Sequence, residues 1–122
     1  MKIQSIRSHE QKMSDMPDAV GLKTRMLIGP AEKANRFHMR HFEIAPGGQT
    51  PHHQHDYEHE IIVLKGKGVA RSVQGDRPFK VGDVIYVPAN EKHQFQNPHE
   101  APCEIVCLIP APKKSAVGVG AR

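Results

Sequence analysis

Four histidines crowd one short stretch of the chain, which reads GGQTPHHQHDYEHEIIVLKGKG from Gly47 to Gly68. The sequence of 122 residues has nine histidines in all, and four of them fall within eight positions, at His52, His53, His55 and His59. Neutral imidazole is a ligand for divalent transition metals such as Zn, Cu, Fe and Ni. Because a polar surface loop could have the same composition, only the spacing of the histidines separates the two interpretations.

The alternation of side chains along a strand indicates which histidines share a face. Residues of equal parity project to the same side, so His53, His55 and His59 would point together. His52 has the other parity and would point away. A further ligand could come from His93, which begins the segment HQFQN. Three or four imidazoles that converge inside a barrel would hold one divalent metal.

The elements that would position these side chains are short apolar runs rich in Val, Ile, Phe and Tyr. Turn signals containing Gly, Pro or Asn separate them, namely APGG, GKG, QGDRP, VGD, PANE and NPHEAP. Many short strands at this spacing favour an all-β sandwich or barrel of the jelly-roll kind. We expect strands over 21–28, 36–44, 60–66, 68–73, 83–88, 93–97 and 103–109.

Local signals add detail to this pattern. Gly66 and Gly68 in LKGKG are expected to flank a tight hairpin turn. Pro88 is expected to end the strand DVIYV and to turn the chain toward His93. Residues 9–19 could form a short helical turn.

Length and charge limit the kind of protein this can be. A chain of 122 residues suits one domain, which we place over residues 1–110, with a disordered tail over 111–122. The net charge is +4, but residues 1–110 hold 14 Lys and Arg against 13 acids. The sequence has no basic helix, so we do not expect a nucleic-acid partner. No run approaches the roughly 18 apolar residues of a membrane span, so we do not expect a membrane partner either. The start of the chain has no apolar signal region, so we expect a cytoplasmic protein.

Two cysteines, Cys103 and Cys107, lie four residues apart in the apolar run PCEIVCLIP. That separation is about 13 Å along a strand, whereas a disulfide needs Cα atoms within about 7 Å. We therefore expect two reduced, buried thiols, and nothing in the local sequence assigns them to a metal site.

Taken in order, two segments of the chain resemble the motifs of the cupin superfamily. The first motif is Gly, five residues, His-x-His, three or four residues, Glu, six residues and Gly, and it matches Gly47 to Gly66 with His59 at the Glu position. The second is Gly, five residues, Pro-x-Gly, two residues, His, three residues and Asn, and it matches Gly82 to Asn97 with Asn90 in place of Gly. Asn accepts positive φ more readily than most other residues, so this second change is mild.

The resemblance implies an all-β, double-stranded β-helix (jelly-roll) cupin barrel with its motif core over residues 47–97. Glu60 would satisfy the four-residue spacing of the first motif, but only five residues would then precede Gly66. Glu58 and Glu60 also have the wrong parity. We therefore expect a four-histidine site for one divalent metal, made by His53, His55, His59 and His93. The resemblance adds Mn and Co to the metals that imidazole suits, which include Fe, Ni and Zn.

Other cavity residues follow from parity. Phe95 and Asn97 share the parity of His93 and are candidates for substrate binding, although Phe95 could pack in the core and Asn97 could end a strand. Tyr57 has the parity of the ligands and is a third candidate for substrate binding, although it falls in an expected loop and could be exposed. Of the adjacent Arg40 and His41, one must face inward, and the sequence does not say which.

The resemblance leaves the reaction open, because cupins include oxygenases, decarboxylases, isomerases, lyases, cyclases and binding proteins. We expect a metal-dependent enzyme that acts on a small oxygen-rich substrate such as a hydroxy acid, a keto acid or a sugar acid. The alternative is a binding or sensing module without turnover. No catalytic residue beyond the metal ligands stands out. Apolar residues on both faces of segment 20–28, with outward Ile62 and Leu64, predict a homodimer.

Overall fold

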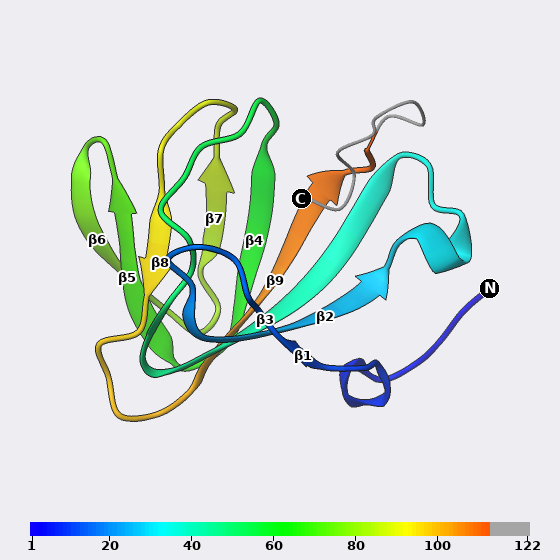
Figure 1. Cartoon of the computed structure of the whole chain (residues 1–122), viewed down its shortest axis with the longest axis horizontal. Helices are drawn as coiled ribbons and strands as arrows, with labels where there is room; N and C mark the ends of the chain where they lie inside the picture. Colours follow the sequence, from blue (N-terminus) through cyan, green and yellow to red (C-terminus); the bar gives the residue numbers. More distant parts are fainter. Residues whose placement is uncertain (113–122) are drawn as a thin grey trace.

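Nine strands form one antiparallel sheet that curls on itself in the computed structural model, which describes residues 1–112 (Figure 1). The strands are β1 Lys12–Met13, β2 Val20–Ile28, β3 Phe37–Gln49, β4 His59–Lys65, β5 Lys67–Ser72, β6 Gly75–Lys80, β7 Val84–Val87, β8 Gln94–Gln96 and β9 Cys103–Pro110. Two short 3₁₀ helices, η1 Ile6–Ser8 and η2 Pro30–Glu32, complete the described elements. The predicted all-β architecture is confirmed as a curled sheet in the form of a half-barrel. The expected disordered tail falls mostly outside the described residues.

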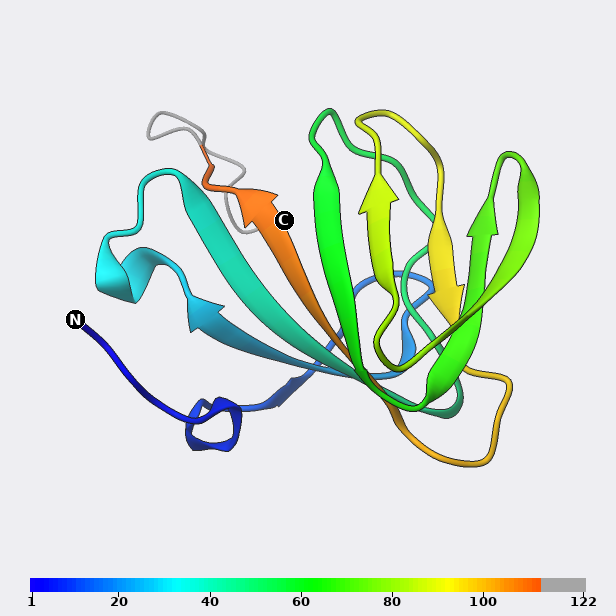
Figure 2. The ribbon, with the colours of Figure 1, turned by 180° about the vertical axis from the view of Figure 1, so that it is seen from behind.

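The strand order makes β3 the link between the two halves of the sheet. The order is β6-β5-β8-β3-β9-β4-β7, and β2 pairs with β3 while β1 pairs with β2. β3 is 13 residues long and runs beside both β2 and β9 for most of its length. Its last residue, Gln49, pairs with Gln96 of β8. Figure 2 shows from behind how the strands of both halves fan out from the region where β3 ends.

The core lies on the concave side of the sheet, where the inward residues of alternating strands meet. In β9, Cys103, Ile105 and Cys107 are fully buried and pack in this core. Both cysteines are free thiols, as the sequence predicts. Burial raises the pKa of Cys103 to about 11 and also raises the pKa of Cys107. Apolar alternation therefore places two protonated thiols in the core.

The turn at the second motif has the backbone that the sequence predicts. Asn90 has a φ of 68°, so the exchange of Gly for Asn preserves the left-handed conformation at this position. Pro88 follows directly after the end of β7, as expected from its missing N–H group. The chain then reaches His93 just before β8.

The structure differs from the sequence-based expectation in three places. Residues 75–80 form β6, although the sequence QGDRP indicates only a turn. This strand lies at the edge of the sheet, where the missing N–H group of Pro78 can be accommodated. The hairpin turn lies between Ser72 and Gly75, not at Gly66, because β4 pairs with β7 and β9 and does not pair with β5. Residues 9–19 contain β1 and no helix.

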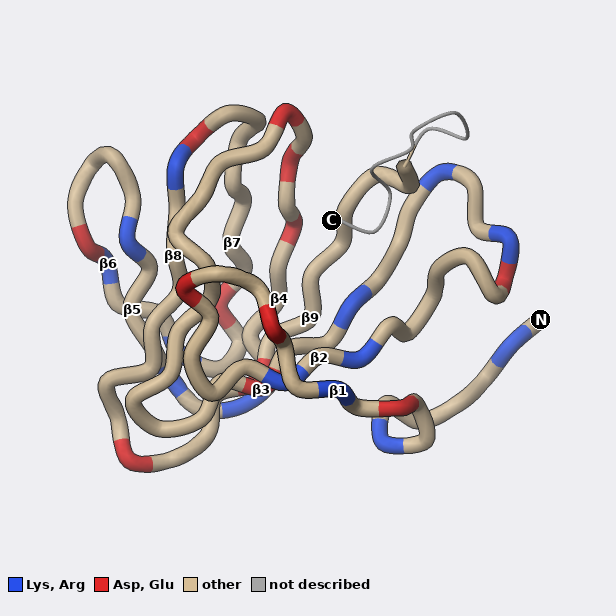
Figure 3. The backbone as a smooth tube through the Cα atoms, in the orientation of Figure 1, with Lys and Arg blue, Asp and Glu red and all other residues tan. Residues whose placement is uncertain are grey.

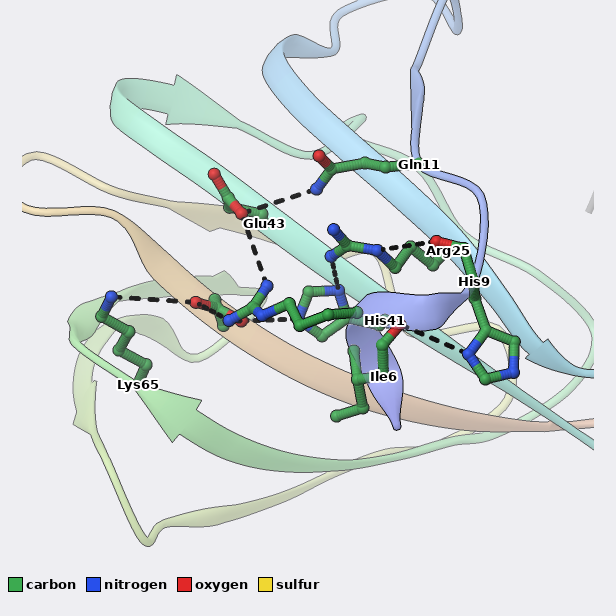
Figure 4. Close-up of polar contacts among 9 residues, drawn as sticks. Ile6, His9, Gln11, Arg25, His41, Glu43 and Lys65 are labelled. Carbon is green, nitrogen blue, oxygen red and sulfur yellow. Dashed lines mark hydrogen bonds and ion pairs between the residues drawn. The ribbon is translucent and has the colours of Figure 1, made fainter. Parts of the chain in front are cut away.

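The N-terminal segment is held on the convex side of the sheet by a buried carboxylate. Arg7 donates two hydrogen bonds to the Glu104 carboxylate, at 2.7 and 2.8 Å. His41 Nε2 lies 2.7 Å from the same carboxylate, and Arg25 lies 3.3 Å from His41 Nδ1 (Figure 4). Because a guanidinium can only donate, Nδ1 accepts and Nε2 carries the proton that His41 donates to Glu104. We call these four residues the Glu104 cluster.

Basic and acidic side chains are interspersed along the backbone (Figure 3). Among the described residues, no helix is long and apolar enough to cross a membrane.

Candidate metal centre

A cavity of about 300 Å³ opens on the concave side of the sheet. Its wall is formed by β1 and the loop after it, β2, β3, the loop before β4, the start of β4, the region of His93 and β8, and the middle of β9. Its polar lining includes the histidines His53, His55, His59 and His93 and the charged residues Lys12, Asp15, Arg25 and Arg40. Its apolar wall includes Met13, Met16, Leu22, Met26, Phe42, Ile61 and Phe95. The cavity is therefore an apolar pocket with a cluster of imidazoles at one side, which is a common form of small-molecule site.

Three of the predicted ligands meet at this cavity. One ring atom each of His53, His55 and His93 lie within 4.8 Å of one another, which is close enough for a single ion to contact all three. The backbone fixes this arrangement, because His53 and His93 pair with each other through N–H···O contacts of 3.2 and 3.0 Å. Asn90 N–H also donates to the carbonyl of His55. The two motif segments are thus joined at the site itself.

His59 is adjacent to this group but is not part of it. Its ring centroid lies 4.9 Å from that of His55 and 5.1 Å from that of His93. The side chain is only 5% exposed, and its Nε2 is buried without a hydrogen-bond partner. The structure therefore groups three histidines rather than four. The orphaned Nε2 beside them is what a fourth imidazole ligand would present.

The hydrogen bonds of two histidines set which ring nitrogen is available. His93 Nδ1 lies 2.9 Å from the Glu91 carbonyl, which can only accept, so Nδ1 carries the proton and Nε2 keeps its lone pair. His59 Nδ1 lies 2.9 Å from Cys107 Sγ, whose own proton can go to the Leu108 carbonyl at 3.8 Å. This arrangement leaves the lone pair of His59 on Nε2. Such outer contacts orient imidazole ligands in metal sites.

Burial keeps these imidazoles neutral. Burial, together with the nearby His93 and Arg40, lowers the pKa of His53 to about 4. Burial and then Arg40 lower the pKa of His59 to about 2. Burial also lowers the pKa of His93, against the opposing effect of its hydrogen bond to Glu91. Metal ligands must be deprotonated, so the site offers unprotonated nitrogens at neutral pH.

The structure also places two residues at the cavity that the sequence left open or assigned elsewhere. Arg40 lines the cavity, whereas His41 faces the opposite side of β3 within the Glu104 cluster. Cys107 lines the cavity as well, beside His59. The parity of Cys107 with the other inward residues of its strand could have indicated this position, but only the pairing of β9 with β4 brings it to a histidine.

Of the remaining candidate residues, some line the cavity and others lie outside it. Tyr57 stacks on His55 with ring centroids 4.6 Å apart, and both it and Phe95 line the cavity. Asn97 is not among the lining residues; its amide donates to the Ile44 and Ala101 carbonyls at 2.9 Å each. This contact geometry fits the interpretation of Asn97 as the end of a strand. Glu58 and Glu60 are exposed and lie outside the cavity wall.

The curled antiparallel sheet, the turns of the two motifs and the histidine cluster are together typical of one class of protein, the cupins. Residues 40–109 match the family described as the cupin domain, and the chain belongs to this family.

Several known proteins are similar to the chain. The structure of the polyketide cyclase RemF from Streptomyces resistomycificus has a TM-score of 0.87 and 31% identity, covering 92% of this chain and 80% of that one. The 1-methylthio-D-xylulose 5-phosphate methylsulfurylase of Rhodospirillum rubrum is 32% identical over 60% of this chain and 47% of its own. The oxalate-binding protein of Thermotoga maritima is 32% identical over 55% of this chain and 56% of its own. The chain thus spans about half the length of these two curated relatives.

Proposed function

We propose that this chain binds one divalent transition metal per chain through His53, His55, His59 and His93, and that a small oxygen-rich molecule binds beside it. The observation that carries the proposal is the convergence of three imidazoles on one cavity, with the buried and unpartnered Nε2 of His59 next to them. An all-imidazole donor set suits Zn, Fe or Ni, and the membership of the cupin family adds Co and Mn as candidates. When bound, such a metal supplies Lewis acidity and a holding point for substrate oxygens.

The residues of the chain supply the remaining features of the site. Tyr57, stacked on His55, restricts the movement of that ring. Phe95, which lies 5.8 Å from His93 between ring centroids, and Phe42 form apolar walls that exclude water around the polar end of the cavity. These contacts favour a site that binds a substrate in one orientation.

The substrate class that we favour is a hydroxy acid, a keto acid or a sugar acid, and we favour turnover by an oxygenase, isomerase, decarboxylase or lyase type of reaction. Support for turnover comes from the similarity to RemF, whose name describes a polyketide cyclase. Polyketides are also rich in oxygen donors, so a polyketide-derived substrate belongs in the same screen. No described residue other than the histidines is assigned a catalytic role.

A second candidate is a binding module without turnover. The similarity to an oxalate-binding protein supports this candidate, because its name describes binding alone. The cavity described above would serve either role. The two candidates differ in whether a bound molecule changes.

The test begins with elemental analysis of protein purified without an affinity tag. We expect about one transition metal per chain, a large loss of metal in His53→Ala and His93→Ala, and no loss in His99→Ala, which removes a histidine outside the cavity. Protein that neither contains nor takes up any of these metals would refute the proposal.

A substrate screen on the metal-loaded protein then separates the two candidates. Hydroxy acids, keto acids, sugar acids and short poly-β-ketones would be assayed in parallel for product and for a rise in the unfolding temperature. Product formation supports the enzyme. Stabilisation by a compound that is recovered unchanged supports the binding module.

A further inference from the structure

One half-buried arginine lines the cavity of the candidate metal centre. Arg40 lies on the cavity side of β3, opposite Cys107 in the pairing with β9. One guanidinium nitrogen is 3.9 Å from Cys107 Sγ, and the centre of the group lies 5.0 Å from the centroid of the Phe42 ring. The ring and the thiol hold the guanidinium in place without neutralising its charge.

No carboxylate of the described chain forms an ion pair with Arg40. Its Nε is buried and has no hydrogen-bond partner. The two arginines of the Glu104 cluster contrast with it in their partners, since Arg7 binds Glu104, and Arg25 binds His41 and the His9 carbonyl. Arg40 as a whole is half-buried, and even partial removal of a guanidinium from water is costly unless an anion compensates for it.

The position of this unpaired positive charge would be unfavourable for a site that bound only a metal ion. A guanidinium beside a cluster of metal ligands repels a divalent cation and weakens its binding. An anion placed between the two would be attracted to both. The arrangement therefore fits a site that is completed by a negatively charged ligand.

We infer that Arg40 determines specificity by binding the carboxylate of a small organic acid whose other oxygens face the histidine cluster. The planar guanidinium offers parallel N–H donors that match the two oxygens of a carboxylate. The contact of the other oxygens with the histidine cluster rests on the proposed metal site. The contact between Arg40 and the carboxylate does not require a metal. A neutral molecule of the same shape would leave the half-buried guanidinium, with its buried Nε, unpaired, so acids are preferred over their amides.

The test compares acids with their neutral counterparts by isothermal titration calorimetry. The probes are lactate and malonate, with lactamide and malonamide as the uncharged partners, and each is titrated into metal-loaded and metal-free protein. The variants are Arg40→Gln, Arg40→Lys and the control Arg36→Gln, which removes an exposed positive charge outside the cavity. Elemental analysis and circular dichroism of every variant record metal content and folding.

For the wild type and Arg36→Gln, we expect the acid to bind at least about tenfold more tightly than its amide. Arg40→Gln should lose about tenfold or more of the acid affinity and little of the amide affinity, and Arg40→Lys should recover part of the loss. Metal content should not fall in Arg40→Gln, because a repulsive charge has been removed.

Three results would overturn the inference. One is equal binding of acid and amide by the wild type, and another is unchanged acid binding in Arg40→Gln. The third is an equal loss of acid and amide binding in that variant, which would indicate a packing role. A wild type that binds no metal but still binds acids through Arg40 would refute the proposed metal site and leave this inference intact.

Discussion

At the scale of single residues, the thiol of Cys107 is the least expected part of the site. It lies 2.9 Å from His59 Nδ1, and when it accepts the proton of Nδ1 it leaves the lone pair of His59 on Nε2, where a metal can bind. Cys103 lies on the same strand and the same face, is equally buried, and contacts none of the cavity histidines among the interactions of the described residues. Substituting each cysteine in turn therefore separates the effect of the contact with His59 from the effect of losing a buried thiol.

We predict that Cys107→Ala lowers the affinity for metal by roughly 10–100-fold, the effect typical of losing the partner that orients a histidine ligand. Cys103→Ala is the matched control and should retain the wild-type affinity, although both variants remove a buried thiol and should lose some stability. Competition against a chelating dye measures the affinities. The same affinity in both variants would contradict the orienting role of Cys107.

At the scale of elements, the Glu104 cluster connects the N-terminal segment to β3 and β9. Burial alone would raise the pKa of Glu104, but the hydrogen bonds from Arg7 and His41 outweigh it, and the pKa lies below its ordinary value of 4.5. The carboxylate form is therefore favoured in the folded state. Its contribution to stability is complete above pH 4.5 and is lost as the pH falls through the lower pKa of the folded state.

We predict that Glu104→Gln destabilises the protein by about 1–3 kcal/mol near neutral pH, because Arg7 and His41 lose a charged acceptor. The difference from wild type in the free energy of unfolding should shrink as the pH falls below 4.5. Glu100→Gln, at an exposed position, is the control. Denaturant titrations over this pH range measure the effect, and a difference that stays constant in acid would argue against the ionised cluster.

Local patterns predict the elements well where one face of a strand is buried, and they fail where a contact depends on distant pairing. Alternation placed most strands and put Phe95 at the cavity. The left-handed backbone at Asn90 followed from its place at the Gly position of the second cupin motif, together with the tolerance of Asn for positive φ. β6 was missed because Gly75 and Pro78 have the composition of a turn, and only an edge position makes them compatible with a strand. The choice between Arg40 and His41 depends on partners from the N-terminal segment and β9, which no local pattern contains.

At the scale of the whole molecule, the convex side of the sheet has an apolar surface that one chain leaves uncovered. Ile62 and Leu64 of β4 are 42% and 40% exposed, as their outward parity predicts. Val84 and Tyr86 of the neighbouring β7 are 77% and 60% exposed. A groove beside them is lined by seven apolar residues and by Lys2, Gln4 and His9; the apolar ones are Ile6, Leu27, Ile28, Met39, Ile62, Leu64 and Val106. Continuous apolar surfaces of this kind favour association.

We predict a two-fold symmetric homodimer that covers this surface and buries at least about 1,200 Å² in total. Sedimentation of tag-free protein at micromolar concentration should give a dimer, and Ile62→Lys should shift it toward the monomer. Val73→Lys, which adds the same charge at an exposed apolar residue of the turn between β5 and β6, should not. A wild type that sediments as a monomer would contradict the prediction.

The long β3 strand also governs the order of events during folding. Its partner β9 lies at the other end of the domain sequence, so their pairing closes a large loop, and sheets dominated by such distant contacts fold slowly. The segments that bear His53 and His93 can meet only once that framework exists, because β3 leads into the first and β8 pairs with its end. Metal should therefore join the chain after the rate-limiting step. In stopped-flow experiments, it should leave the refolding rate nearly unchanged and slow unfolding, because the ion binds to a sheet that has already formed and holds its segments together.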